Sequence, residues 1–174
     1  MLFNQKQICL NNPCGSLTIR CTEPGDKNTG RPCEACDLMS GKSECMINNK
    51  VLKCAGGDCK SNNLLYCAQC SECSLSYFGK SVQQFSTRIA QHRRSLLIAD
   101  FDELSDENTL AAHAYYNHGA RSKRDFNKLY DFYVVKKLDP LNLTINEQHY
   151  INKFRTLKPL GLNLENPICL PRNL

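Results

Sequence analysis

The pattern of apolar and polar residues divides the chain near residue 63. Before that point Cys, Asn, Gly, Lys and Pro dominate, and no helical or strand period is sustained. After it, short apolar runs at 64–66 and 75–78 enclose a cysteine-containing stretch. This pattern predicts two strands joined as a hairpin that is held by its cysteines, with Gly79 ending the second strand.

Helical spacing follows this hairpin. We expect Ser81 to cap a helix of roughly four turns that continues to about residue 99. A second helix is predicted over 109–117, and Gly119 ends it. The apolar positions that define the first helix are Val82, Phe85, Ile89 and Leu96.

The last third of the chain predicts one strand and one helix. A charged connector at 121–125 leads into a strand over 126–138, where aromatic and β-branched residues alternate between two faces. Thr144 and Glu147 fit a capping box that opens a helix through about residue 157, and Lys158-Pro159 ends it. Together these elements predict an α+β fold: a small antiparallel three-stranded sheet flanked by helices.

The cysteines add a second part to this picture, because eleven of the twelve precede Leu75 and only Cys169 follows it. Thiols confined to one segment are typical of metal ligation, whereas a disulfide framework would staple the whole chain. The first 62 residues also lack the apolar content to fold by burial alone. We therefore predict a cysteine-rich, zinc-stabilised module at 1–62 and a second domain at 63–174.

Two C-x-x-C pairs have the spacing of a zinc knuckle, and two knuckles make a tetrahedral thiolate site. Two cysteines between the pairs are alternative ligands, so the predicted structural zinc ligands are Cys33, Cys36, Cys54, Cys59, Cys70 and Cys73. A second site is open to Cys9, Cys14, Cys21 and Cys45. A zinc ion shared with the hairpin would tie the cysteine-rich module to the strands that follow.

His113 and His118 lie on the second predicted helix, five residues apart. This spacing places them off a common helical face. A satisfied polar role is therefore favoured over metal ligation at both positions.

Bulk properties narrow the class of protein without deciding it. The N-terminal residues contain no long apolar run, so we expect neither a signal peptide nor a membrane span, and an intracellular location. A net charge of +5 and a pI near 8.6 are compatible with a polyanionic partner. Basic residues in the cysteine-rich loops fit contact with the DNA backbone, and a solvated loop surface explains them nearly as well.

The chemistry of phosphodiester hydrolysis needs an activated water and groups that offset charge on phosphorus and on the leaving oxygen. Arg88 is suited to clamp phosphate oxygens, and His92 follows one helical turn later on the same face. Glu147 could be the one protein carboxylate on Mg²⁺, which keeps waters and takes phosphate oxygens as other ligands. Tyr66 or Tyr77 near that cation could transfer a proton.

Each of these residues also has a structural explanation. Tyr66 and Tyr77 on strands are usually packing residues. Arg88 and His92 can form the solvated face of an amphipathic helix. Glu147 completes the predicted capping box. Taken one at a time, these explanations are favoured over catalysis.

In combination, the residues resemble the GIY-YIG endonuclease domain over roughly the last two thirds of the chain. The two name-giving triplets correspond to 64–66 and 77–79, although Leu64 replaces the first glycine and Phe78 an aliphatic residue. The likeness extends to the endonuclease of Penelope-like retroelements, where a C-x-x-C pair sits between the motif strands. The residues that carry the resemblance are Tyr66, Tyr77, Phe78, Gly79, Arg88, His92, Glu147, Gly161, Leu162 and Asn163.

The resemblance implies a divalent-metal-dependent DNA endonuclease that nicks target DNA for insertion of a mobile element. Tyr66 would orient or deprotonate the attacking water, Tyr77 would contact the scissile phosphate, and Arg88 would stabilise the transition state. Glu147 would bind a single Mg²⁺ or Mn²⁺, and Asn163 would support the site.

The resemblance also implies partners and a location. His92 matches a histidine that some members carry one turn after the arginine. DNA would be the substrate, the reverse transcriptase part of a larger retroelement protein a partner, and the nucleus the place of action.

Two other classes stay open. A catalytically inactive, zinc-dependent nucleic-acid-binding protein predicts salt-dependent DNA binding without cleavage. A secreted disulfide protein predicts almost no reactive thiols.

Overall fold

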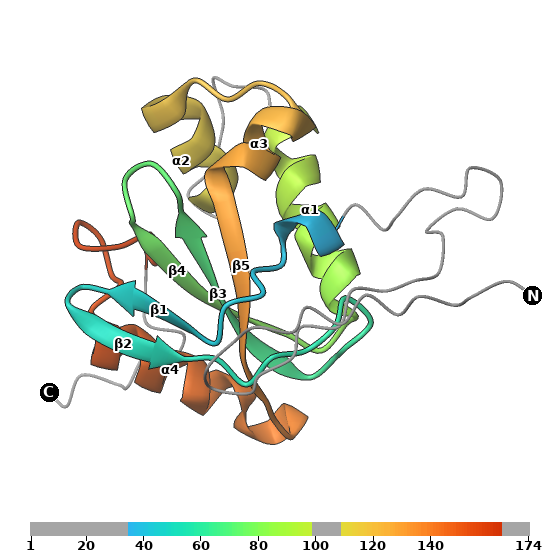
Figure 1. The fold of residues 1–174 in the computed structure, drawn as a ribbon, viewed down its shortest axis with the longest axis vertical. Coiled ribbons are helices and arrows are strands. Elements are labelled where there is room, and N and C mark those ends of the chain that lie inside the picture. The colour runs from blue at the N-terminus through green and yellow to red at the C-terminus, as the bar shows by residue number, and fades with distance from the viewer. Residues whose placement is uncertain (1–34, 99–108, 165–174) are drawn as a thin grey trace, which may run out of the picture.

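The computed structural model describes residues 35–98 and 109–164 (Figure 1). Its main sheet has three antiparallel strands in the order β4-β3-β5. These strands are β3 (Leu64–Cys70), β4 (Ser76–Ser81) and β5 (Tyr130–Lys137). The α+β class and the three-stranded antiparallel sheet predicted from the sequence are therefore confirmed.

The described residues also form four α-helices, two short 3-10 turns and a separate two-stranded hairpin. The helices are α1 (Phe85–Ile98), α2 (Thr109–His118), α3 (Lys123–Leu129) and α4 (Leu143–Phe154), and the turns are η1 (Cys36–Leu38) and η4 (Pro140–Asn142). No helix within these described ranges is both long and apolar enough to span a membrane.

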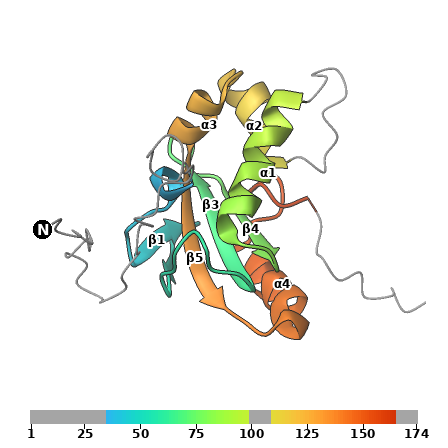
Figure 2. The same cartoon turned by 90° about the vertical axis from the view of Figure 1, so that its right-hand side faces the viewer.

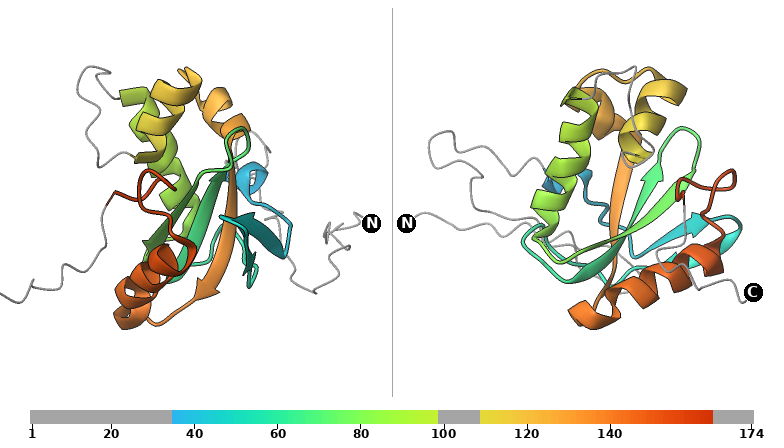
Figure 3. Two further views of the ribbon diagram at one scale, coloured as in Figure 1. Left: turned by 90° about the vertical axis from the view of Figure 1, so that its left-hand side faces the viewer. Right: turned by 180° about the vertical axis from the view of Figure 1, so that it is seen from behind.

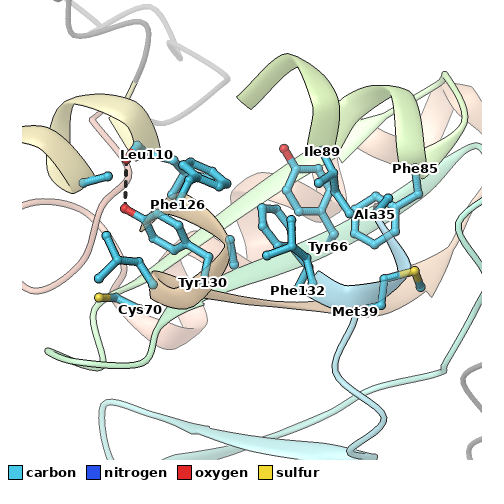
Figure 4. Close-up of a cluster of buried hydrophobic side chains, with 14 of the residues drawn as sticks. Ala35, Met39, Tyr66, Cys70, Phe85, Ile89, Leu110, Phe126, Tyr130 and Phe132 are labelled. Carbon is cyan, nitrogen blue, oxygen red and sulfur yellow. Dashed lines mark hydrogen bonds between the residues drawn. The ribbon is translucent and has the colours of Figure 1, made fainter. Parts of the chain in front are cut away.

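The sheet separates two apolar layers, because successive side chains of a strand point to opposite faces. Tyr66 and Ala68 of β3 pack against α1, α2 and α3 on one face. Leu65 and Cys67 face a small hairpin and α4 on the other. Figure 2 shows α1 and this hairpin on opposite sides of the sheet, and Figure 4 shows aromatic residues of the first layer.

The small hairpin pairs β1 (Glu44–Ile47) with β2 (Lys50–Lys53). Its inward residues Ile47 and Leu52 are each 1% exposed, so this segment does bury apolar side chains, contrary to the expectation for the first sixty residues. The hairpin runs alongside α4 (Figure 3), to which the Lys50 ammonium donates a hydrogen bond at the Lys153 carbonyl. The domain boundary near residue 62 stays a prediction.

The strand expected over 126–138 starts later, because its first residues belong to α3. Ser122 caps this helix: its hydroxyl accepts a hydrogen bond of 3.2 Å from the Asp125 amide and donates one of 2.8 Å to the Asp125 carboxylate. Phe126 and Leu129 are buried at helical spacing. The expectations of a charged connector at 121–125 and of a strand from 126 were therefore wrong, because the Ser122 cap favours a helix over Lys123–Leu129.

The capping box expected at Thr144 and Glu147 is also wrong. Helix α4 begins at Leu143, and its N-cap Asn142 makes no side-chain capping bond. The Thr144 hydroxyl instead accepts a hydrogen bond of 2.7 Å from the Lys80 ammonium. The helix ends at Phe154, where the next residue adopts the left-handed conformation, so it is shorter than expected.

The first helix starts at Phe85 rather than near Ser81. Strand β4 continues through Gly79 to Ser81, because Gly79 pairs with Tyr66 inside the sheet. Val82 is 61% exposed and does not belong to the apolar face of the helix.

Candidate active site and metal centre

Tyr66 is fully buried, yet its hydroxyl has two polar partners from α1. The oxygen lies 2.7 Å from Nε2 of His92 and accepts a hydrogen bond of 3.2 Å from Nε of Arg88. Arg88 and His92 reach it together because they lie one helical turn apart on the same face. The structure thus brings three of the predicted site residues into direct contact.

The protonation states of this group follow from burial. Burial raises the pKa of Tyr66 well above its ordinary value, Tyr77 adds to the shift, and Arg88 only partly offsets it. Burial, followed by the charge of Arg88, lowers the pKa of His92 to about 3. At neutral pH a neutral phenol therefore faces a neutral imidazole, and the Tyr66 hydroxyl donates to Nε2. His92 was expected to meet water or phosphate and meets Tyr66 instead.

Tyr77 stands beside Tyr66 and is the more accessible phenol. The two ring centroids are 6.2 Å apart, and the Tyr77 side chain is within hydrogen-bonding reach of Arg88 and Tyr66. Burial raises its pKa, with Arg88 opposing the shift. A partly exposed phenol next to a guanidinium is suited to contact an anionic ligand.

Gly79 makes room for both phenols. A Cβ at this position would lie 2.5 Å from the Tyr66 hydroxyl oxygen and 2.7 Å from Cε1 of Tyr77. Any side chain would therefore displace a ring, and the Tyr66 ring can lean across β4 only because residue 79 is glycine.

Glu147 lies on α4, and its direct partner is Lys80 of β4. The Lys80 ammonium is 3.1 Å from Oε2 of Glu147, whose side chain is 10% exposed. Burial raises the pKa of Glu147, and the hydrogen bond and charge of Lys80, then the charge of Arg88, oppose that shift. The charge of Glu147 in turn raises the pKa values of Tyr66 and Tyr77. The carboxylate therefore shares one electrostatic environment with the residues of α1 and β3.

Lys80 is a polar residue that the sequence analysis did not single out. A signal for it exists, since it directly follows the 77–79 triplet. Its partners on α4 depend on how that helix packs against β4, and no sequence spacing gives this.

Asn163 fixes the backbone of β4. Its Oδ1 accepts hydrogen bonds from the Phe78 amide (3.0 Å) and the Thr156 hydroxyl (2.8 Å), and its Nδ2 donates to the Phe78 carbonyl (2.8 Å). The side chain is buried and its hydrogen-bonding atoms are occupied. Asn163 thus positions the strand that carries Tyr77 and Gly79.

A second group of side chains gathers at the turn between β3 and β4. The ligand atoms of Cys70, Cys73, His113 and His118 all lie within 4.8 Å of one another. The Cys73 sulfur is 3.4 Å from Nε2 of His113, and the Cys70 sulfur is 3.5 Å from Nε2 of His118. Two thiols and two imidazoles form the Cys₂His₂ donor set that suits tetrahedral Zn²⁺, so this cluster could hold a metal such as zinc.

The outer nitrogens of both imidazoles are already engaged, as is usual for metal-binding histidines. Nδ1 of His113 is 2.7 Å from the Tyr130 hydroxyl, which itself donates to the Leu110 carbonyl at 2.8 Å (Figure 4). Nδ1 of His118 is 3.0 Å from the Glu72 carboxylate. Both contacts are made through Nδ1, and Nε2 of each ring faces a sulfur.

Of the predicted zinc ligands, the structure groups Cys70 and Cys73 with two histidines, and the remainder of the ligand set stays a prediction. Cys33, like Cys9, Cys14 and Cys21, lies outside the described residues. Among the described residues, the partners of Cys70 and Cys73 are the two histidines, while Cys36 and Cys59 lie in the first apolar layer and Cys54 lies in the second.

The expectation that their spacing keeps His113 and His118 apart was wrong. His118 is the last residue of α2, and Gly119 then turns the chain with a φ of 64°. The two ring centroids are 4.8 Å apart. The signal that could have found this site is the pattern C-x-x-C followed by H-x₄-H over 70–118.

Comparison with protein-family models, curated proteins and solved structures gives no match. The function is therefore argued from the geometry of these two sites.

Proposed function

We propose that the protein is a divalent-metal-dependent DNA endonuclease of the GIY-YIG type, which hydrolyses phosphodiester bonds. The observation that carries this proposal is the buried hydroxyl of Tyr66, held between His92 and Arg88 with Tyr77 alongside. This buried phenol is hydrogen-bonded to both a neutral imidazole and a guanidinium. Burying these polar groups costs desolvation free energy, and a role in packing alone would not require them.

Tyr66 and His92 would act together as the general base, with the proton passing from water to Tyr66 and from Tyr66 to His92. If Tyr66 accepts a proton from the attacking water, its own proton moves along the 2.7 Å contact to Nε2 of His92. The low pKa of His92 opposes this step in the free protein, and burial and the charge of Arg88 cause that low value. A phosphate bound at Arg88 would bring negative charge nearby and make the imidazolium less costly.

Arg88 would hold the phosphate. Its Nε donates to Tyr66, and one terminal nitrogen donates to Gln91 at 3.1 Å. A guanidinium has five N–H donors, so donors are left for phosphate oxygens. The same residue would thus bind the substrate and orient the phenol.

Glu147 fits a hard divalent cation. It is a nearly buried carboxylate with an ammonium as its counter-charge, and a cation would replace Lys80 at the oxygen. When bound, Mg²⁺ or Mn²⁺ would supply Lewis-acid stabilisation of the leaving oxygen. The displaced Lys80 would remain close enough to contact the substrate backbone.

The metal centre would support this site from the end of the hairpin. Cys70 lies four residues after Tyr66 on the same strand, and a zinc ion at Cys70 and Cys73 would link this strand end to α2. Its proposed role is therefore structural. Nicking for mobile-element insertion, a reverse transcriptase partner and a nuclear location belong to the same proposal and rest on the family resemblance.

A catalytically inactive DNA-binding protein is the second candidate. The ion pair between Lys80 and Glu147 favours it, because the carboxylate is already neutralised without a metal. This candidate predicts DNA binding that weakens with salt and no cleavage in any metal.

A plasmid-nicking assay separates the two candidates. We expect the zinc-loaded protein to convert supercoiled DNA to the nicked form with Mg²⁺ or Mn²⁺ and not with EDTA. Glu147→Gln should lower the rate by at least about 100-fold, the usual effect of losing one charge-stabilising group. Asp37→Asn is the matched control, since Asp37 is an exposed acid on η1. Equal rates for wild type and Glu147→Gln would contradict the proposal.

A further inference from the structure

Three further thiols meet on the face of the sheet that is turned away from Tyr66. They belong to three separate segments: Cys45 to β1, Cys54 to the residue after β2, and Cys67 to β3. The thiol of Cys45 is in hydrogen-bonding contact with both Cys54 and Cys67. All three are free thiols in the second apolar layer.

The strand pattern explains why these thiols meet. Cys45 and Ile47 point inward from β1. Leu52 of β2 and Cys54, the residue after β2, also point inward, so both cysteines lie on the buried face of the hairpin. Cys67 points toward them because it alternates with Tyr66 and Ala68, which face the helices.

The three sulfurs do not have the same surroundings. Cys45 contacts both Cys54 and Cys67, so it is the sulfur that both possible pairs share. A disulfide on this face would therefore include Cys45, whose thiolate is the nucleophilic form of the side chain.

Accessibility favours Cys54 over Cys67 as the partner of Cys45. Cys45 and Cys54 are each 8% exposed, whereas Cys67 is 0% exposed in the central strand. Cys54 directly follows β2, where its amide donates a hydrogen bond of 2.7 Å to the Ser43 carbonyl. It thus lies at the end of a two-stranded hairpin, whereas Cys67 lies in a strand that is paired on both sides.

We propose that Cys45 and Cys54 form a reversible disulfide when a peroxide oxidises the protein. The Cys45 thiolate attacks one peroxide oxygen, the O–O bond breaks, and hydroxide leaves to give a sulfenic acid. The Cys54 sulfur then attacks the Cys45 sulfur, so that the S–S bond forms, the S–O bond breaks and water leaves. In total two thiols and one hydrogen peroxide give one disulfide and two waters. A dithiol reverses the reaction.

This site is distinct from the Cys70–Cys73 cluster. Cys70 belongs to the first apolar layer, on the opposite face of the sheet from Cys67. The proposal does not depend on the nuclease assignment, because it rests on the β1–β2 hairpin and on chemistry at sulfur alone.

Peptide mapping tests the proposal in the full chain. After one molar equivalent of hydrogen peroxide and blocking of free thiols, trypsin should release peptide 43–50, which holds only Cys45, cross-linked to peptide 54–60. Dithiothreitol should abolish the cross-link. Because 54–60 also contains Cys59, fragment spectra of the wild-type product must place the bond at Cys54.

Variants provide matched controls. Cys59→Ser and Cys67→Ser should keep the cross-link, whereas Cys54→Ser should lose it and leave a sulfenic acid at Cys45 that dimedone traps. Absence of the cross-link in the wild type, or a bond from Cys45 to Cys59 or to peptide 61–80, would overturn the proposal. The wild-type fragment spectra decide the question even if Cys54→Ser does not fold.

Discussion

Gly79 shows how closely the residues of the candidate site are packed. The Cβ of Gly79→Ala would lie closer to both phenol side chains than van der Waals contact allows, so one ring must move. Forcing extra volume into a packed site typically costs 1–3 kcal/mol, and we expect a loss of about that size in the free energy of unfolding. Urea denaturation measures it. Gly41→Ala is the control, since nothing lies within 4 Å of its added Cβ. Equal stability of both variants would contradict the packing described.

His92 should make the protein sensitive to mild acid. Its pKa is about 3 when folded and 6.5 ordinarily, so between these values the unfolded chain binds a proton that the folded chain does not. The free energy of unfolding therefore falls as pH falls through this window, by up to about 1.4 kcal/mol per pH unit.

His92→Gln isolates this contribution, because glutamine can still accept the Tyr66 hydrogen bond without titrating. Urea denaturation at pH 7 and pH 5 should show a smaller loss of stability for the variant than for the wild type. The same loss in both proteins would mean that His92 is protonated in the folded state.

At the scale of single residues, the sequence predicted the members of the candidate site more accurately than their contact partners. The motif residues Tyr66, Arg88 and His92 do meet. The bond from Tyr66 to His92 and the pairing of Glu147 with Lys80 were not predicted. Motif spacing fixes positions along the chain, whereas the partner of a buried polar group depends on how helices pack against the sheet.

Among the elements, β5 and α2 together support the metal centre through Tyr130. Its hydroxyl holds Nδ1 of His113 and is anchored at the Leu110 carbonyl. Tyr130→Phe keeps the ring in the core and removes this support, so we expect zinc affinity to fall by about 10–100-fold. Competition with a chromogenic chelator measures the change.

Tyr133→Phe is the matched control for this experiment, because Tyr133 is a buried tyrosine of the same strand on the opposite face. It should leave zinc affinity unchanged. Equal affinities for Tyr130→Phe and the wild type would show that the hydroxyl does not orient His113.

Element boundaries show where sequence patterns are insufficient. The two strands 64–70 and 76–81 and helix α2 lie close to their predicted places, because apolar runs and Gly119 mark them. The chain at 123–129 forms a helix although 126–129 were predicted to begin a strand, since Ser122 and Asp125 provide a cap. Capping contacts of this kind compete with propensity over only a few residues, and their outcome is difficult to predict.

The whole molecule places two chemical centres on one strand. Tyr66 lies in the middle of β3 and Cys70 at its end, so a metal at the β3–β4 turn would stiffen the strand that carries the phenol. Zinc removal should therefore loosen β3 and β4 together. Hydrogen exchange of amides in 64–81 should accelerate on chelation, whereas the amides of β1 and β2 should change little. Unchanged exchange in 64–81 would contradict this coupling.

The measurement that tests the central claim most directly is the single-turnover rate of strand cleavage by Arg88→Ala, at saturating protein and with Mn²⁺. Arg94→Ala is the matched control, because Arg94 is an exposed residue of the same helix. The account predicts that Arg88→Ala lowers the rate by about 10²–10³-fold while Arg94→Ala stays close to the wild type. Cleavage by Arg88→Ala at the wild-type rate would contradict it.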